Sequence, residues 1–157
     1  MAQWKPEPTP DQYRRGLYIV VQRTIPLPYL MIFDAPDGNA FCTRRDRSNT
    51  PTQALTLLND PLFFECARHV GRRVVQRHQT TNERLQQAFL LTLGRTPSAE
   101  ETDELNTFLA EQSKLLNKYP AFAGDIAGSS MGDVQETALW SCLARVLMNT
   151  DEFISRE

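Results

Sequence analysis

The sequence predicts an all-α protein, a compact irregular bundle of about six helices with two long loops. Two observations predict it: helix-start signals recur along the chain, and the apolar residues behind them follow the helical period. No segment shows a convincing strand pattern. A chain of 157 residues suits one hydrophobic core. We therefore expect a single helical domain over residues 1–157.

A capping residue followed by Glu or Gln at the third helical position opens most of the predicted helices. Asp60 and Pro61 mark a further start, because aspartate caps a helix and proline suits its first turn. The capping pattern occurs at residues 9–12, 50–53, 80–83, 98–101 and 133–136. Apolar stripes at helical spacing follow these starts, at Tyr13, Leu17, Val20 and Val21, at Phe63, Cys66, Ala67, Val70 and Val74, at Leu85, Ala88, Phe89 and Leu93, and at Leu105, Phe108, Leu109 and Leu116.

The last long helix, from about Val134 to Met148, is apolar on most sides, so we expect it at the centre of the bundle with Trp140 in the core. Two connections are long. Residues 24–49 contain three prolines and a turn signal and are predicted to form a packed loop, with room for a short extended piece near Leu30–Phe33. Residues 119–132 are rich in Gly, Ala and Ser and are predicted to form a flexible loop.

Composition excludes several classes of protein. The net charge of −2 argues against a nucleic-acid binder, and no apolar run is long enough to span a membrane. The first ten residues are polar and proline-rich, so this chain shows no secretory signal. Three scattered cysteines do not make a disulfide framework; Cys66 and Cys142 are predicted to be buried free thiols, and Cys42 lies in a loop. No haem-attachment motif occurs, and no cofactor is predicted for this chain.

The segment from Cys42 to Pro61 combines arginines with helix-start signals. Arg44, Arg45 and Arg47 come just before the helix start at Thr50, where free backbone N–H groups favour anions. These three arginines and Thr50 are our candidate anion site. Alternatively, the arginines pair with aspartates and fasten the long loop to the bundle. The candidate partners are Asp34, Asp37, Asp46 and Asp60, and the structural motif consists of Asn49, Pro51, Gln53, Asn59, Asp60 and Pro61.

Other candidate sites have simpler interpretations. Glu65 and His69 are spaced as metal ligands can be, but no third ligand follows, so we predict a surface pair. Asp34, Asp37 and Asn39 do not match a calcium-loop spacing and predict a turn. We predict neither a metal site nor a catalytic residue. A group of arginines at the end of one helix is predicted to be a solvated face rather than a nucleic-acid patch: Arg72, Arg73 and Arg77.

Several segments resemble one bacterial domain family. The most specific is residues 42–55, CTRRDRSNTPTQAL, followed by LLNDP at 57–61 and LGRTP at 93–97. With RTIP at 23–26, FDAPD at 33–37 and LMNTDEF at 147–153, they resemble the C-terminal part of the DUF1553 or PSD1 domain of planctomycete-type bacteria, nearly from end to end. The resemblance implies a larger, exported parent protein with preceding domains and often a cytochrome c-like module. It implies no catalytic residue in this chain.

Our first functional hypothesis is a structural or interaction module of a larger extracytoplasmic protein, in the periplasm or at the cell surface. The apolar residues between Ile25 and Phe33 are too numerous for a free loop, so we expect them to cover the bundle or meet the missing N-terminal domains. The isolated chain is then expected to expose an apolar patch or to self-associate. The alternatives are a module that binds an anion or a sulfated glycan through Arg44, Arg45 and Arg47, and a part of a multidomain, cytochrome c-linked enzyme.

Overall fold

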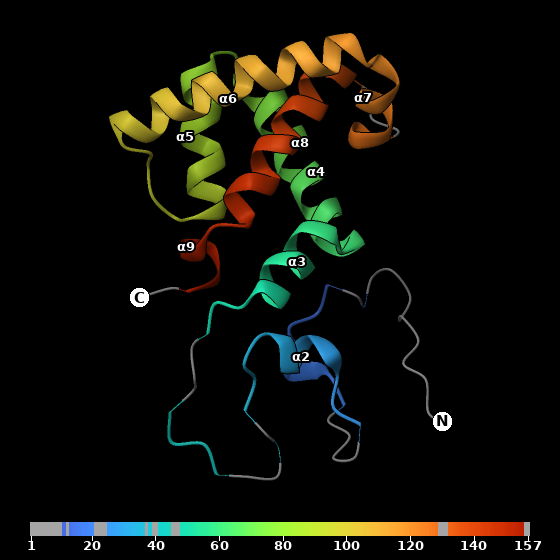
Figure 1. Ribbon diagram of the computed structural model, residues 1–157, viewed down its shortest axis with the longest axis vertical. Helices are drawn as coiled ribbons and strands as arrows, with labels where there is room; N and C mark the ends of the chain where they lie inside the picture. Colours follow the sequence, from blue (N-terminus) through green and yellow to red (C-terminus); the bar gives the residue numbers. More distant parts are fainter. Residues whose placement is uncertain are drawn as a thin grey trace. The chain divides into compact units, whose positions relative to one another are not determined.

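The computed structural model describes residues 11, 13–20, 25–36, 38, 41–44, 48–128 and 132–155. The regular elements in these ranges are all helical, which confirms the all-α prediction. The chain divides into two compact units, Met1–Gln53 and Ala54–Glu157. The single domain expected over residues 1–157 stays a prediction. The elements are η1 (Gly16–Tyr18), α2 (Pro28–Ile32), α3 (Pro51–Asn59), α4 (Pro61–Arg77), α5 (Thr81–Thr92), α6 (Ala99–Lys118), α7 (Pro120–Ala127), α8 (Val134–Met148) and α9 (Asp151–Ile154) (Figure 1).

The first unit contains less helix than the sequence predicts. The long helix expected behind Thr9 is wrong for residues 13–20, where the only helical element is the 3-10 turn η1. Asp11 is helical, while Thr9, Gln12 and Val21 lie outside the described residues. An amphipathic helix is stable only when its apolar stripe packs against something, and Leu17 on this stripe is 80% exposed. The extended piece expected near Leu30–Phe33 is also wrong, because α2 occupies Pro28–Ile32.

In the second unit, the capping signals place the helix starts as predicted. Thr80 and Ser98 each form a complete capping box with the glutamate three residues later. Asp60 accepts a hydrogen bond of 2.8 Å from the Leu62 amide, and Asp133 accepts one of 3.1 Å from the Glu136 amide. These side chains pair backbone N–H groups that the first turn of a helix leaves without partners. Local sequence therefore determines where α4, α5, α6 and α8 begin.

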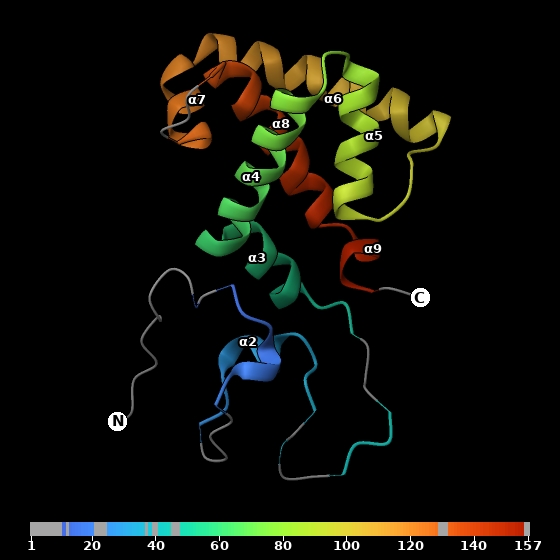
Figure 2. The same cartoon turned by 180° about the vertical axis from the view of Figure 1, so that it is seen from behind.

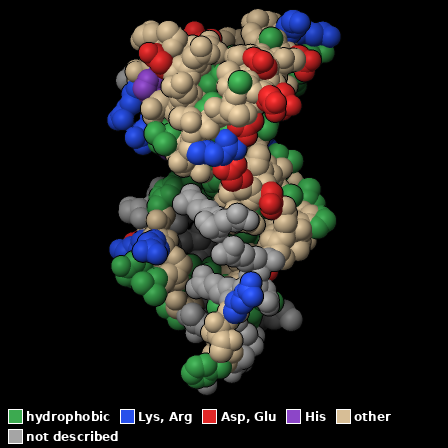
Figure 3. All heavy atoms as spheres, turned by 90° about the vertical axis from the view of Figure 1, so that its left-hand side faces the viewer, with side chains coloured by type: hydrophobic (Ala, Val, Ile, Leu, Met, Phe, Trp, Pro, Cys, Tyr) green, Lys and Arg blue, Asp and Glu red, His purple; other side chains and the backbone are tan. Residues whose placement is uncertain are grey.

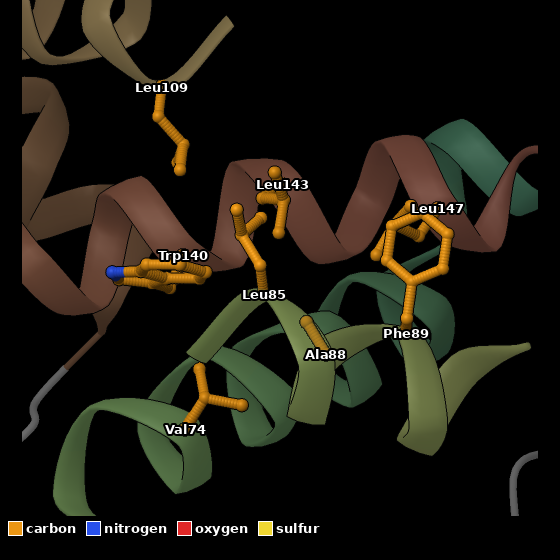
Figure 4. Close-up of a cluster of buried hydrophobic side chains, with 8 residues drawn as sticks. All are labelled: Val74, Leu85, Ala88, Phe89, Leu109, Trp140, Leu143 and Leu147. Atoms are coloured by element: carbon orange, nitrogen blue, oxygen red, sulfur yellow. The ribbon is translucent and has the colours of Figure 1, made fainter. Parts of the chain in front are cut away.

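Helix α8 is the centre of the second unit, as its apolar composition predicts. It packs against α4, α6 and α7, and Figure 2 shows the same neighbours from behind. Trp140, Leu143 and Leu147 of α8 lie in one core cluster (Figure 4). The other buried members come from α4, α5 and α6, and are Val74, Leu85, Ala88, Phe89 and Leu109. The prediction that Trp140 belongs to the core is confirmed.

Helices α4 and α8 approach each other closely at Gly71. A Cβ atom at this position would lie 2.6 Å from Ser141 Oγ and 2.7 Å from Ser141 N. Real Cβ atoms essentially never show contacts below 3.0 Å, so the crossing requires glycine here. Ser141 is fully buried, and its hydroxyl donates to Thr137 O at 2.6 Å. The missing side chain of Gly71 thus sets the distance between the two helices.

The flexible loop predicted over residues 119–132 is wrong for residues 120–127, which form α7. Pro120 occupies the first helical position, where its missing N–H costs nothing. Ala123 and Ala127 are completely buried in a second core cluster with Leu116 and Ala138. The small side chains of this segment, which suggested a loop, instead let α7 pack closely against α8. No helix in the described part of the chain is long and apolar enough to cross a membrane.

Candidate functional site

The start of α3 is fastened to the preceding segment by one buried side chain, Gln53. Its amide Nε2 donates to Ile32 O at 2.8 Å, Ser48 Oγ at 3.1 Å and Asp34 Oδ2 at 3.2 Å. Its Oε1 accepts from the Thr50 amide at 3.0 Å, while the Gln53 amide donates to Thr50 Oγ1 at 3.3 Å. The capping box predicted here is therefore confirmed. We call these five residues the Gln53 clamp.

Asp34 is the charged member of the Gln53 clamp. Its Oδ2 accepts from Ser48 Oγ at 2.7 Å and from the Ser48 amide at 2.8 Å. Hydrogen bonds from the Ser48 side chain and backbone, and then from Gln53, hold the pKa of the Asp34 carboxyl below its usual value. Asp34 also has a positive φ of 53°, which is uncommon for a residue with a side chain. The described part of the predicted turn, at Asp34, is present and brings a carboxylate to Ser48 and Gln53. Asp37 and Asn39 lie outside the described residues.

The predicted anion site is only partly within the described residues. Arg44 is exposed, whereas Arg45 and Arg47 lie outside them. Thr50 uses its hydroxyl to cap α3. Of the aspartates proposed as partners of these arginines, Asp37 and Asp46 also lie outside the described residues, and Asp60 caps α4. The anion site therefore stays a prediction. The described hydrogen bonds that hold this segment include amide and hydroxyl groups that donate to the Asp34 carboxylate.

Four arginines of the second unit instead hold helices together. Arg68 donates through Nε to Ile126 O at 2.6 Å and also bonds Asp125 O, the last carbonyls of α7. Arg145 bonds Leu58 O at the end of α3, and its guanidinium lies over the Phe64 ring, as does that of Arg68. Guanidinium groups complement the negative end of a helix dipole. Two further arginines form ion pairs: Arg84 with Glu136, and Arg95 with Glu101 and Glu152.

Arg95 belongs to the LGRTP segment, where its neighbour Gly94 ends α5 with a positive φ of 79°. Its guanidinium bonds both carboxylate oxygens of Glu101 at 2.6 and 2.8 Å, and both of Glu152 at 2.7 Å. It also lies over the Phe89 ring at 5.4 Å. Sequence reasoning singled out the LGRTP segment but missed this ion-pair cluster, because Glu152 lies 57 residues away.

Glu101→Gln is expected to lower the melting temperature at neutral pH and to have no effect near pH 2. Hydrogen bonds from Arg95 lower the pKa of Glu101 from 4.5 to about 2. A lowered folded pKa gives stability that is present above about pH 4.5 and is lost as the pH falls toward 2. Glutamine retains the capping of Ser98. Melting curves at pH 6, 4 and 2 check this, with exposed Glu104→Gln as the control; a pH-independent difference contradicts it.

The remaining sequence candidates are structural. His69 Nε2 lies 3.8 Å from Glu65 Oε1, and both side chains are exposed, which confirms the predicted surface pair. No group of three or more potential metal ligands occurs within the described residues. Cys66 and Cys142 are half-buried free thiols, and burial raises the pKa of both. Cys42 is exposed, and its Sγ donates to Arg44 O.

Charged side chains do not form one large patch on the face that Figure 3 shows. Lys and Arg side chains lie there in several separate groups, and some adjoin Asp or Glu. The predicted solvated face at the end of α4 includes Arg73 and Arg77, and both are exposed. Together with residues of α5 they line a pocket of about 210 Å³. This pocket was not predicted, because its α5 side comes from residues of ordinary helical composition.

Comparisons with known proteins give one match. The sequence model of the family described as PSD1, a protein of unknown function (DUF1553), matches residues 1–109. This range contains the arginine segment, the Gln53 clamp and the LGRTP turn; the LMNTDEF segment lies beyond it. No curated protein matches, and no solved structure matches. The family model covers more than half of the chain, and the chain therefore belongs to the PSD1 (DUF1553) family.

Proposed function

We propose that this chain is a structural and protein-interaction module, in which the first unit docks onto neighbouring domains of a larger extracytoplasmic parent protein. One observation carries the proposal: among the described residues of the first unit, six large apolar side chains are exposed. We call them the exposed apolar set, and they are Tyr13, Leu17, Tyr18, Val20, Met31 and Phe41. Exposed apolar side chains gathered in one unit are typical of surfaces that another protein covers.

The first unit lacks an apolar core of its own among the described residues. Only Gln53 is buried there, and its contacts are polar. Gly16 lies beside the Leu30 side chain, so η1 and α2 are neighbours, yet neither element contains a buried residue. A unit that buries so little apolar surface gains little hydrophobic stabilisation. A covering partner would supply the missing burial.

The sequence predicted an interaction surface at residues 25–33, but most of the exposed apolar set lies outside this range. Most apolar residues in this range are half-buried, and Met31, at 64%, is the exposed one. The larger exposures belong to the segment before them, at Leu17 and Val20, and to Phe41 after them. The proposed docking surface therefore draws on residues 13–41 rather than on the predicted loop alone.

The isolated chain is expected to self-associate, because an uncovered apolar surface binds to copies of itself. Sedimentation equilibrium over a range of protein concentrations measures this. Leu17→Ser/Val20→Ser should give a monomer throughout. Leu90→Ser/Leu115→Ser is the control: it removes two exposed leucines from α5 and α6 and should leave the association unchanged. A wild-type chain that stays monomeric at every concentration would count against the proposal.

A second candidate is the binding of an anion or a sulfated glycan by Arg44, Arg45 and Arg47. This candidate is favoured because two of the aspartates predicted as partners of these arginines have other partners. Asp34 accepts three hydrogen bonds from Ser48 and Gln53, and Asp60 caps α4. Titration with a sulfated oligosaccharide, followed by NMR, should shift the Arg44 resonances. Shifts that are absent there, or that persist in the triple alanine variant, exclude this candidate.

A further inference from the structure

We propose that the pocket between α4 and α5 binds a small oxyanion, such as a phosphate, sulfate or carboxylate head group. Arg73, Val74 and Arg77 of α4 line one side, with His78 at the helix end. Gln87 and Leu91 of α5 line the other side. Helices α4 and α5 pack against each other, and Figure 2 shows them from the face on which both are in front.

Arg73 and Arg77 differ from the arginines that hold the second unit together. Arg68, Arg84, Arg95 and Arg145 each donate to a carbonyl or carboxylate of another segment. Within the described part of the chain, no ion pair or hydrogen bond engages the side chain of either Arg73 or Arg77. Two guanidinium groups are thus left on one helix turn, free to bind a ligand.

The lining is chemically suited to one anionic head group. Guanidinium groups present planar pairs of N–H donors that match phosphate, sulfate and carboxylate oxygens. The Gln87 amide and the His78 ring add hydrogen-bonding groups, and no carboxylate lines the pocket. The nearest acid along the chain, Glu83, bonds the Thr80 amide in its capping box. An anion in the pocket therefore meets donors without facing a lining carboxylate.

The size and the apolar wall narrow the class of ligand. At about 210 Å³ the pocket is smaller than the sites that enclose drug-sized molecules. Val74 and Leu91 provide an apolar side on which a short aliphatic or aromatic substituent can rest. The C-terminal end of α4 carries partial negative charge, which the two arginines must outweigh. The expected ligand therefore has one anionic head group and a small apolar body. The head group alone, as inorganic phosphate or sulfate, should bind weakly.

NMR titration of the full chain with inorganic phosphate and with sulfate, against chloride at equal ionic strength, tests this proposal. Saturable shifts are expected at residues 73–78, 87 and 91. Arg73→Ala/Arg77→Ala should weaken binding at least tenfold, and Gln87→Leu should weaken it less. The control Lys114→Ala/Lys118→Ala removes two exposed cations of α6, so it has the same net charge and should bind as the wild type does.

Three outcomes would overturn the proposal. The first is the absence of saturable shifts in the pocket with either anion. The second is equal weakening in the two charge-matched variants, which indicates screening by net charge. The third is loss of binding in the control alone, which places the anion on α6. None of these outcomes bears on the association of the exposed apolar set, so the two proposals fail independently.

Discussion

Gly71→Ala is expected to destabilise the second unit by about 3 kcal/mol, because the added methyl group overpacks a closed helix crossing. Two of the three atoms that it meets, Ser141 N and Cα, belong to the backbone, so rotation of a side chain cannot relieve the contact. The helices must move apart, which opens the core around Trp140 and Leu143. For the same reason, adding Ser141→Ala should recover little of the loss.

Urea unfolding followed by circular dichroism measures the effect of Gly71→Ala. Gly124→Ala is the matched control, since Gly124 also lies in a helix but its added Cβ atom meets nothing within 4 Å. Alanine is the better helix former, so the control should stabilise the chain by roughly 0.5–1 kcal/mol. Effects of opposite sign in the two variants cannot arise from helix propensity alone, because alanine replaces glycine in a helix in both. A Gly71→Ala variant as stable as the wild type would show that the crossing is looser than described.

Gln53→Met should release the segment before α3, at a cost of about 2–3 kcal/mol to the first unit. Methionine fills a similar volume, but it makes none of the four hydrogen bonds of the glutamine amide. Ile32 O and the Thr50 amide then lose the partner that pairs them. Unpaired polar groups at a buried position cost more than the hydrogen bonds themselves contribute.

Amide hydrogen exchange reports this loss residue by residue. The Ser48 amide is held by Asp34 and the Thr50 amide by Gln53, so both should exchange faster in Gln53→Met. The Leu85 amide, in the core of the second unit, should not change. Gln86→Met makes the same replacement at an exposed position of α5 and is the control. Unchanged exchange at Ser48 and Thr50 would mean that the clamp does not hold the segment.

Helix starts were predictable from sequence because capping is local. Thr80, Ser98 and Asp133 each act on an amide three residues away, so the information lies within one turn. The central position of α8 was predictable for a related reason: a helix that is apolar on most sides must be buried on most sides. Both features depend on residues that are close in the chain, and both are confirmed.

Long-range polar contacts were not predictable. The sequence suggested that arginines fasten the connecting segment, which stays a prediction. It did not reveal that Gln53 bonds this segment, through groups 5 to 21 residues away. Arg95 and Glu152 meet only because the fold brings the α5 turn to the start of α9. Helix α7 was missed because its Ala- and Gly-rich composition looks like a loop until its burial against α8 is known. A local sequence pattern does not reveal which distant segment will pack against it.

The most direct test of the proposed docking compares the oxidation of two methionines by dilute hydrogen peroxide. Met31 is 64% exposed in the first unit, and Met148 is 6% exposed in the core of the second. In the dilute isolated chain, mass spectrometry should find Met31 oxidised much faster than Met148. Within the complete parent protein, the Met31 rate should fall toward that of Met148. A Met31 rate that is the same in both settings would contradict a covered docking surface.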